Sequence, residues 1–170
     1  MRRAALAGLL ALSLAVPAGA AAPAARMTIK SFEQLHQPLP LPYNETADAD
    51  RAVAAALARA KQSGKPLIID LGGNWCIDCR VLAGTMRTEP LRSWVARRFE
   101  LVMVDVGRFD RNLQVPARYG LTSRLAGVPA LLIVDPRTGK LINRRHETAL
   151  ADASSMNPQA LADWLARWAG

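Results

Sequence analysis

Two cysteines are the residues of this sequence best suited to carry out chemistry. Cys76 and Cys79 are the only cysteines, and they stand at C-x-x-C spacing in the segment LIIDLGGNWCIDCRVL, residues 67–82. Such a pair can be a redox-active dithiol, half of a metal site, a haem attachment point or a small structural bridge. A bridge over two intervening residues removes little entropy from the unfolded chain, so a purely structural role is disfavoured.

The flanking pattern places both thiols at the start of a helix. The apolar run at 67–72 predicts a buried strand, and a helix is expected from Cys76 to about Thr88. At a helix N-terminus, unpaired backbone N–H groups and the helix dipole favour thiolate over thiol. Cys76 is therefore the expected nucleophile. Cys79, one turn further on the same face, is the expected resolving thiol.

Three charged residues near the cysteines are expected to influence this chemistry. Asp70 lies in the predicted strand, where burial would raise the pKa of its carboxyl group and let it exchange a proton. The alternative is a solvated aspartate at the strand end. Asp78 should disfavour the Cys76 thiolate by about 1 kcal/mol if the site is well hydrated, and Arg80 should partly offset this. A less stable thiolate means a more stable disulfide, which favours a reductase or isomerase over a primary oxidant.

The rest of the pattern predicts one α/β domain that positions these residues. The expected helices are 48–63, 76–88, 90–98, 115–119 and 157–168; the expected strands are 67–72, 99–106, 130–134 and one that begins at Lys140. The first two strands should be parallel, because a helix connects them, and the last two should form an antiparallel hairpin. This order predicts a mixed four-stranded central sheet flanked by helices.

The first 20 residues have the pattern of a secretory signal peptide. Arg2 and Arg3 precede an uncharged run, 4–18, and the small residues Ala18-Gly19-Ala20 follow as a cleavage signal. An uncleaved membrane anchor is the alternative; after cleavage, no stable membrane insertion is expected. We expect a periplasmic or secreted protein, in which residues 21–47 form an extended Pro-rich segment and 48–170 form the domain. In such an oxidising compartment a cysteine pair can form a disulfide.

Composition and charge exclude several classes of function. The chain has 170 residues, 51% of them apolar, which suits a single domain with a real core. Its formal charge is +8, but the basic residues are mostly scattered and no aromatic residues interleave with them, so no nucleic-acid partner is expected. His36 and His146 form no zinc-type spacing with the cysteines, and haem attachment would need histidine where Arg80 stands. No cofactor is expected; a Cu(I)-carrying protein is a remaining alternative, because two thiolates suit Cu(I).

Several motifs together resemble the thioredoxin superfamily. They are Trp75-Cys76-x-x-Cys79 after a strand, Asp70 before it, and Gly127-Val128-Pro129 leading into another strand. The resemblance covers about residues 48–168. The signal peptide and three segments further resemble a bacterial group of exported thioredoxin-like proteins described as disulfide isomerases or interchange proteins. These segments are LPYNETADA, NWCIDCRVL and DVGRFDRNL.

This resemblance implies a thioredoxin-like fold and a thiol:disulfide oxidoreductase that reduces or isomerises protein disulfides. It implies that Asp70 accepts and donates the proton of the inner cysteine. It also implies a cis bond between Val128 and Pro129, opposite the cysteines, that leaves the Val128 backbone free to pair with a substrate segment. A trans bond is the alternative. Trp75 is the third residue expected to bind substrate.

The expected partners are protein or peptide disulfides and a separate redox protein or small thiol. The redox protein or small thiol is needed because a domain with one cysteine pair cannot restore the redox state of that pair by itself. A non-catalytic binding or chaperone module on the same fold is the main alternative. The sequence departs from thioredoxins in having Gly72-Gly73 at the end of the strand, where thioredoxins carry bulkier residues. It also has no lysine in the second strand to pair with Asp70, and its loop at LTSRLA is longer.

Overall fold

A computed structural model of the protein describes residues 22–122 and 124–169. The predicted signal peptide lies outside these residues. Within them, no helix is both long enough and apolar enough to cross a membrane.

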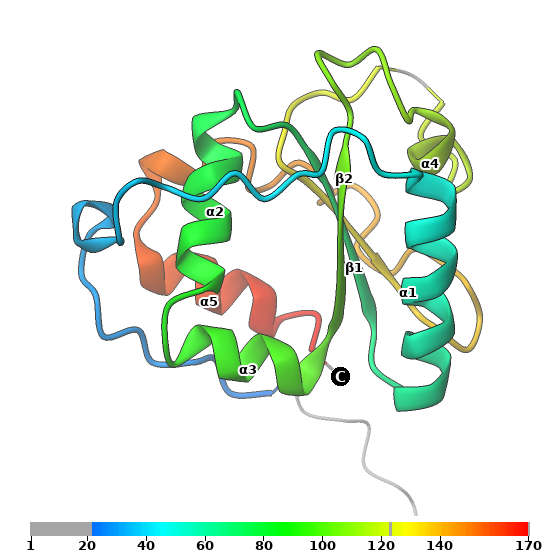
Figure 1. The fold of residues 1–170 in the computed structure, drawn as a ribbon. Coiled ribbons are helices and arrows are strands. Elements are labelled where there is room, and N and C mark those ends of the chain that lie inside the picture. Colours follow the sequence, from blue (N-terminus) through cyan, green and yellow to red (C-terminus); the bar gives the residue numbers. More distant parts are fainter. Residues whose placement is uncertain (1–21, 123, 170) are drawn as a thin grey trace, which may run out of the picture.

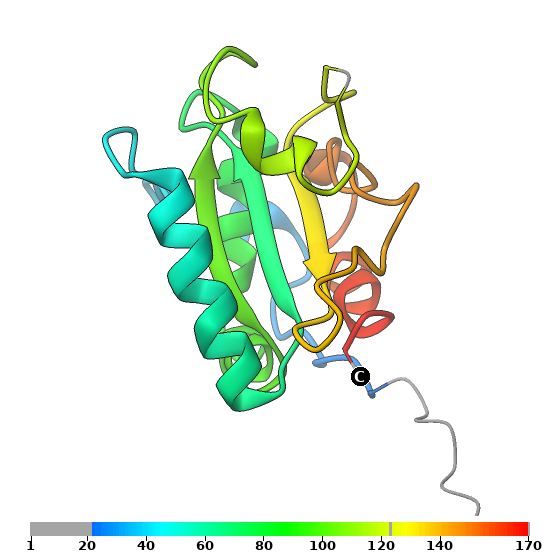
Figure 2. The same ribbon diagram turned by 90° about the vertical axis from the view of Figure 1, so that its right-hand side faces the viewer.

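A three-stranded sheet forms the centre of the domain. Its strands are β1 (Leu67–Gly72), β2 (Glu100–Asp105) and β3 (Ala130–Val134), and their order across the sheet is β2-β1-β3. The strand β1 runs parallel to β2, as predicted, and it runs antiparallel to β3 (Figure 2). Every residue of β1 is buried, and Asp70 pairs with Met103 on one side and Leu131 on the other. The carboxyl group of Asp70 therefore belongs to the central strand of the sheet.

The predicted fourth strand is wrong: within the described residues the sheet has three strands. A single bridge joins Val134 to Leu141, and then the chain leaves the ladder. The buried side chain of Asn143 takes the place of strand backbone: its Oδ1 accepts the N–H of Ile133 at 2.9 Å, and its Nδ2 donates to the carbonyl of Leu131 at 2.7 Å. Because these bonds satisfy buried backbone groups at the edge of β3, no further strand is needed there.

Helices cover both faces of the sheet (Figure 1). One face carries α1 (Ala49–Ser63) and the short α4 (Gln114–Ala117); the other carries α2 (Ile77–Met86), α3 (Leu91–Arg98) and α5 (Pro158–Ala166). The ends of these helices lie within two residues of the predicted ones. Asp48 and Asn157 cap α1 and α5 by accepting backbone N–H groups, which explains where both helices begin.

Residues 35–47, which we call the strap, cross α2 and the sheet (Figure 1). They follow a short 3-10 turn, η1 (Phe32–Gln34), and precede α1. Arg80 of α2 donates to the carbonyl groups of Leu39 and Pro40, at 2.9 and 3.2 Å. These bonds fix the strap against the helix that carries both cysteines.

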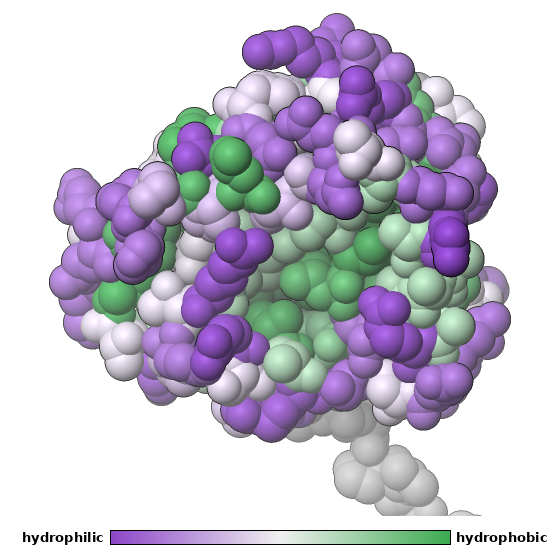
Figure 3. Space-filling model, viewed as in Figure 1, coloured by the Kyte–Doolittle hydropathy of each residue, from purple (hydrophilic) through white to green (hydrophobic). Residues whose placement is uncertain are grey.

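The strand β2, at one edge of the sheet, carries mostly apolar side chains. Within the described residues β2 pairs only with β1, and its side chains at Leu101, Val102 and Met103 are partly buried. Figure 3 shows a hollow with apolar side chains in the region where Figure 1 draws β2. The strand has only six residues, and α1 packs beside it, which limits its use as a pairing edge.

Candidate active site

Cys76 and Cys79 lie together at the N-terminus of α2 and form a disulfide. Their Cα atoms are 5.3 Å apart. Cys76 is the N-cap of the helix, and its Sγ accepts the backbone N–H of Cys79 at 3.1 Å. Cys79 is fully buried, whereas Cys76 keeps 5% of its surface exposed. The outer sulfur is thus the one that a second molecule can approach.

The two glycines at the end of β1, Gly72 and Gly73, allow close packing on either side of the cysteines. A Cβ at Gly72 would overlap the Tyr43 hydroxyl and lie 2.8 Å from Cys79 Sγ. A Cβ at Gly73 would lie 2.6 Å from Nε1 of Trp75. The departure from bulkier residues at these positions therefore has a steric reason: each glycine makes room for one aromatic side chain.

Asp70 lies inside the protein rather than in solvent. It is fully buried, and the hydroxyl of Tyr43 donates to its Oδ1 at 2.9 Å. Its Oδ2 has no hydrogen-bond partner among the described residues. Burial raises the pKa of Asp70 to about 7, although the hydrogen bond from Tyr43 acts in the opposite direction. This carboxyl group can therefore change protonation state near neutral pH.

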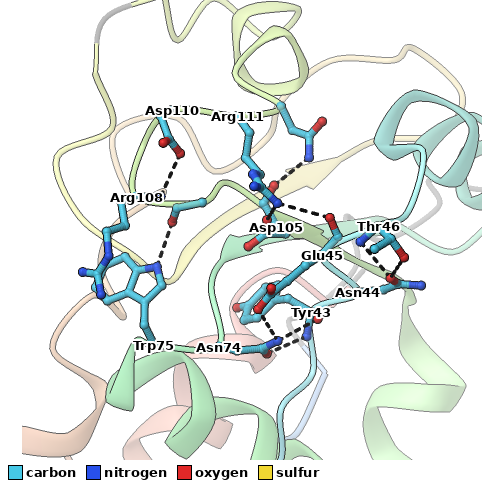
Figure 4. Close-up of polar contacts among 12 residues, drawn as sticks. Tyr43, Asn44, Glu45, Thr46, Asn74, Trp75, Asp105, Arg108, Asp110 and Arg111 are labelled. Atoms are coloured by element: carbon cyan, nitrogen blue, oxygen red, sulfur yellow. Dashed lines mark hydrogen bonds and ion pairs between the residues drawn. The ribbon is translucent and has the colours of Figure 1, made fainter.

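Tyr43 is a site residue that the sequence did not reveal. It belongs to the strap, and only 3% of its surface is exposed. Asn74, two residues before Cys76, accepts the N–H of Tyr43 at 3.0 Å and donates to its carbonyl at 2.8 Å (Figure 4). Burial, followed by the charge of Asp70, raises the pKa of Tyr43, so its hydroxyl stays protonated. The segment LPYNET was part of the family resemblance, but nothing in its spacing marked the tyrosine.

The outer side of the cysteine pair carries aromatic and cationic groups, which we call the rim: Trp75, Arg108, Phe109 and Arg124. Trp75 is 44% exposed, and its Nε1 donates to the carbonyl of Gly107 at 2.8 Å. The guanidinium of Arg108 lies 5.0 Å from the centre of the Trp75 ring (Figure 4), and that of Arg124 lies 4.8 Å from the centre of Phe109. Phe109 meets Trp75 edge-on. The rim thus presents positively charged groups that lie over aromatic rings.

Val128 and Pro129 lie next to the outer cysteine. Both residues are buried, and the peptide bond between them is cis. The carbonyl oxygen of Val128 lies 3.4 Å from Cys76 Sγ. Their role in substrate binding, like that of Trp75, stays a prediction.

Asp78 and Arg80 have structural partners away from the sulfur atoms. Asp78 Oδ1 accepts the N–H and the hydroxyl of Ser154, at 2.8 and 2.7 Å, in the short turn η2 (Ala153–Ser155). Arg80 holds the strap, and in the described part of the chain these two side chains form no ion pair with one another. Their effect on the redox potential stays a prediction.

A metal-binding group of at least three side chains is absent from residues 22–122 and 124–169. No three histidine, cysteine, aspartate or glutamate side chains gather there in a way that could hold a metal ion.

Comparisons with known proteins agree with this geometry. A family model described as thioredoxin-like matches residues 48–136. The chain belongs to the thioredoxin-like family. It is 38% identical over 84 residues to the thiol:disulfide interchange protein DsbD 1 of Pseudomonas aeruginosa, an alignment that covers 48% of this chain and 13% of that protein. The chain therefore corresponds to a small part of this relative.

A solved thioredoxin-like relative covers much more of the fold. The crystal structure of a disulfide isomerase from Xylella fastidiosa Temecula1 is 40% identical, with a TM-score of 0.69, and the alignment covers 75% of this chain and 96% of that one. Together with the Cys76–Cys79 pair, the family supports thiol–disulfide oxidoreductase activity at a general level. The resemblance seen in the sequence is confirmed.

Proposed function

We propose that this protein is an exported oxidoreductase that reduces or isomerises disulfides in other proteins. The observation that carries the proposal is the Cys76–Cys79 disulfide at the start of α2, with a buried carboxyl group, Asp70, nearby in β1. The relatives named above as an interchange protein and a disulfide isomerase support the same reaction class.

The reaction begins with the reduced pair. The Cys76 thiolate, stabilised by the Cys79 N–H and the helix N-terminus, attacks one sulfur of a substrate disulfide. A bond forms between Cys76 Sγ and that sulfur, the substrate S–S bond breaks, and the other substrate sulfur leaves as a thiolate. The product of this step is a mixed disulfide between enzyme and substrate.

The second step needs the Cys79 thiol to lose its proton. Asp70, with a pKa of about 7, is the group proposed to receive that proton. The Cys79 thiolate then attacks Cys76 Sγ, the internal disulfide forms, and the bond between Cys76 Sγ and the substrate sulfur breaks. The substrate has gained two electrons and leaves as two thiolates, which take up protons from water. A separate redox partner must return two electrons to the enzyme, and Asp70 returns its proton to Cys79. Where a substrate thiol attacks the mixed disulfide first, the outcome is isomerisation.

Substrate contact is proposed at the outer cysteine. The Val128 carbonyl beside Cys76 Sγ is placed to pair with an extended backbone, in the manner of an added strand. Trp75 offers an exposed aromatic surface on the rim. The signal-like pattern of residues 1–20 supports a periplasmic location, where disulfide substrates occur.

Insulin reduction by the purified domain, driven by a small dithiol, tests this function. Wild-type protein should accelerate the reaction, and Cys76→Ser should fall to the uncatalysed rate, because the nucleophile is missing. Cys79→Ser should instead accumulate a mixed disulfide with the substrate, which mass spectrometry detects. Equal activity of wild type and Cys76→Ser would instead favour the alternative, a non-catalytic binding or chaperone module. Copper bound tightly by the reduced protein, without insulin reduction, would point to the Cu(I) carrier.

A further inference from the structure

We propose that Tyr43, contributed by the strap, carries the proton between Cys79 and Asp70. This relay rests on the proposed function, since it concerns the step in which Cys79 resolves the mixed disulfide. It assigns a chemical role to the N-terminal segment, which lies outside the matched family region of residues 48–136.

The Tyr43 hydroxyl contacts one of the two groups that it would connect and packs near the other. It donates to Asp70 Oδ1 at 2.9 Å. It also lies against Gly72 together with the inner sulfur: a Cβ added to Gly72 would overlap the hydroxyl and lie 2.8 Å from Cys79 Sγ. The oxygen atom of Tyr43 thus contacts the proton acceptor directly, and it and the sulfur of the proton donor both face the same point beside Gly72.

The position of this hydroxyl is fixed rather than incidental. Asn74 holds the backbone of Tyr43 through both its N–H and its carbonyl group, and Asn74 lies in the turn that leads to Cys76. Tyr43 and Asp70 are both buried, so the described residues offer the proton a route through the hydroxyl. In that part of the chain Asp70 forms no ion pair, and Tyr43 is its hydrogen-bond partner.

The transfer balances without an ionised tyrosine. In the mixed disulfide, the Cys79 S–H bond breaks and its proton binds Tyr43 Oη, while the Tyr43 O–H bond breaks and that proton binds Asp70 Oδ1. Cys79 becomes a thiolate, Asp70 becomes a neutral acid, and Tyr43 is neutral before and after. The raised pKa of Tyr43 agrees with a residue that accepts one proton while it gives up another and so stays uncharged. Reduction of the disulfide runs the transfer in reverse.

A reaction with an aromatic disulfide reagent that releases a coloured thiolate separates the two sulfur steps. The first thiolate is released when Cys76 attacks the reagent, and the second when Cys79 attacks the mixed disulfide. For Tyr43→Phe we expect an unchanged first release. The second release should be about a hundredfold slower at neutral pH, the lower end of the range for a lost proton-transfer group. Its rate should also lose the dependence on pH near 7 that Asp70 gives the wild type.

Tyr119→Phe is the matched control, because Tyr119 is the other tyrosine of the chain. Both of its releases should match the wild type, and thermal unfolding should show that each variant is folded. The relay is overturned if the second release of Tyr43→Phe is as fast as in wild type or faster, as expected if Asp70 acts directly through Oδ2. Equal slowing of both releases also overturns it, since that indicates a structural effect.

Two further measurements keep the test decisive. If Tyr43→Phe does not fold, Asn74→Ala replaces it, because this variant keeps the hydroxyl but loosens its position. A slower second release with an unchanged first release supports the relay. Unchanged rates of both releases overturn it. A wild-type protein that fails to reduce insulin refutes the proposed function. A wild-type protein that reduces insulin, with kinetics insensitive to Tyr43, refutes only the relay.

Discussion

The inner and outer sides of the Cys76–Cys79 pair differ in burial and in charge. On the inner side, Cys79, Asp70 and Tyr43 are almost completely buried, and one hydrogen bond connects the last two. On the outer side, the rim residues Trp75 and Arg108 are exposed and carry positive charge over an aromatic ring. Under the proposed function, this difference separates two tasks: proton movement occurs away from water, whereas capture of a substrate occurs at the surface. Changes on the inner side should alter stability and pH dependence, and changes on the rim should alter substrate preference.

The largest effect is expected from Asp70→Asn. The pKa of Asp70 is raised to about 7 in the folded protein from 3.8 in an exposed aspartate, so the folded state holds the proton more tightly. The stabilising contribution of the protonated form is present below about pH 4 and is lost as the pH rises through about 7. Ionisation of this buried group costs the folded state about 4 kcal/mol. Asp70→Asn avoids that cost, so it should be more stable than wild type at about pH 8.

Urea unfolding of the oxidised proteins at about pH 4 and about pH 8 measures this difference. The gap in the free energy of unfolding between Asp70→Asn and wild type should widen from the lower to the higher pH. Asp163→Asn, at an exposed position on α5, is the control and should show no such widening. A gap that is the same at both pH values would show that the Asp70 carboxyl group does not titrate in this interval.

Alanine substitutions at the adjacent glycines Gly72 and Gly73 compare the packing of the inner and outer sides directly. In Gly72→Ala the new methyl group would meet the buried Tyr43 hydroxyl and Cys79 Sγ, which have no room to move. We expect the free energy of unfolding to fall by about 1–3 kcal/mol, the usual cost of overpacking a core. In Gly73→Ala the methyl group would meet Trp75, whose half-exposed ring can shift outward, so the loss should be below about 1 kcal/mol. Urea unfolding of both variants tests the comparison, and equal losses would contradict it.

Local patterns in the sequence were sufficient to predict most of this arrangement. The apolar run of β1, the helix start at Cys76 and the cap at Asn157 depend on residues close to one another along the chain, and the structure places them within two residues of the predicted positions. The cysteine pair follows from the same short segment, which is why its place at the start of α2 could be anticipated. Burial of Asp70 followed from its position inside an apolar strand.

The residues that the sequence did not reveal act over long separations. Tyr43 reaches Asp70 from a Pro-rich segment without periodicity, and that contact spans 27 residues. Asn143 lies in a run typical of a strand, but its amide bonds to β3 replace the ladder that the pattern suggested. In both cases a single polar side chain satisfies a buried partner, and no propensity or spacing encodes that choice.

The smallest effect on stability is expected at the rim, from Arg108→Ala. Its guanidinium lies over the exposed ring of Trp75 and forms no ion pair within the described residues, so its loss should change the free energy of unfolding by no more than about 1 kcal/mol. The free positive charge should instead favour peptide disulfides with acidic residues beside the cystine. Steady-state reduction of matched acidic and basic peptides should show kcat/KM falling about fivefold for the acidic peptide alone.

The remote variant Arg137→Ala controls for a general loss of positive charge, because Arg137 lies in the turn after β3 and is largely exposed. It should leave the ratio between the acidic and basic peptides unchanged. If Arg108→Ala slows both peptides equally, the guanidinium acts by holding the Trp75 ring in place, and the rim then contributes shape rather than charge to substrate capture. Selective loss for the acidic peptide, with kcat preserved, would place charge recognition on the outer side and leave the proton chemistry of the inner side untouched.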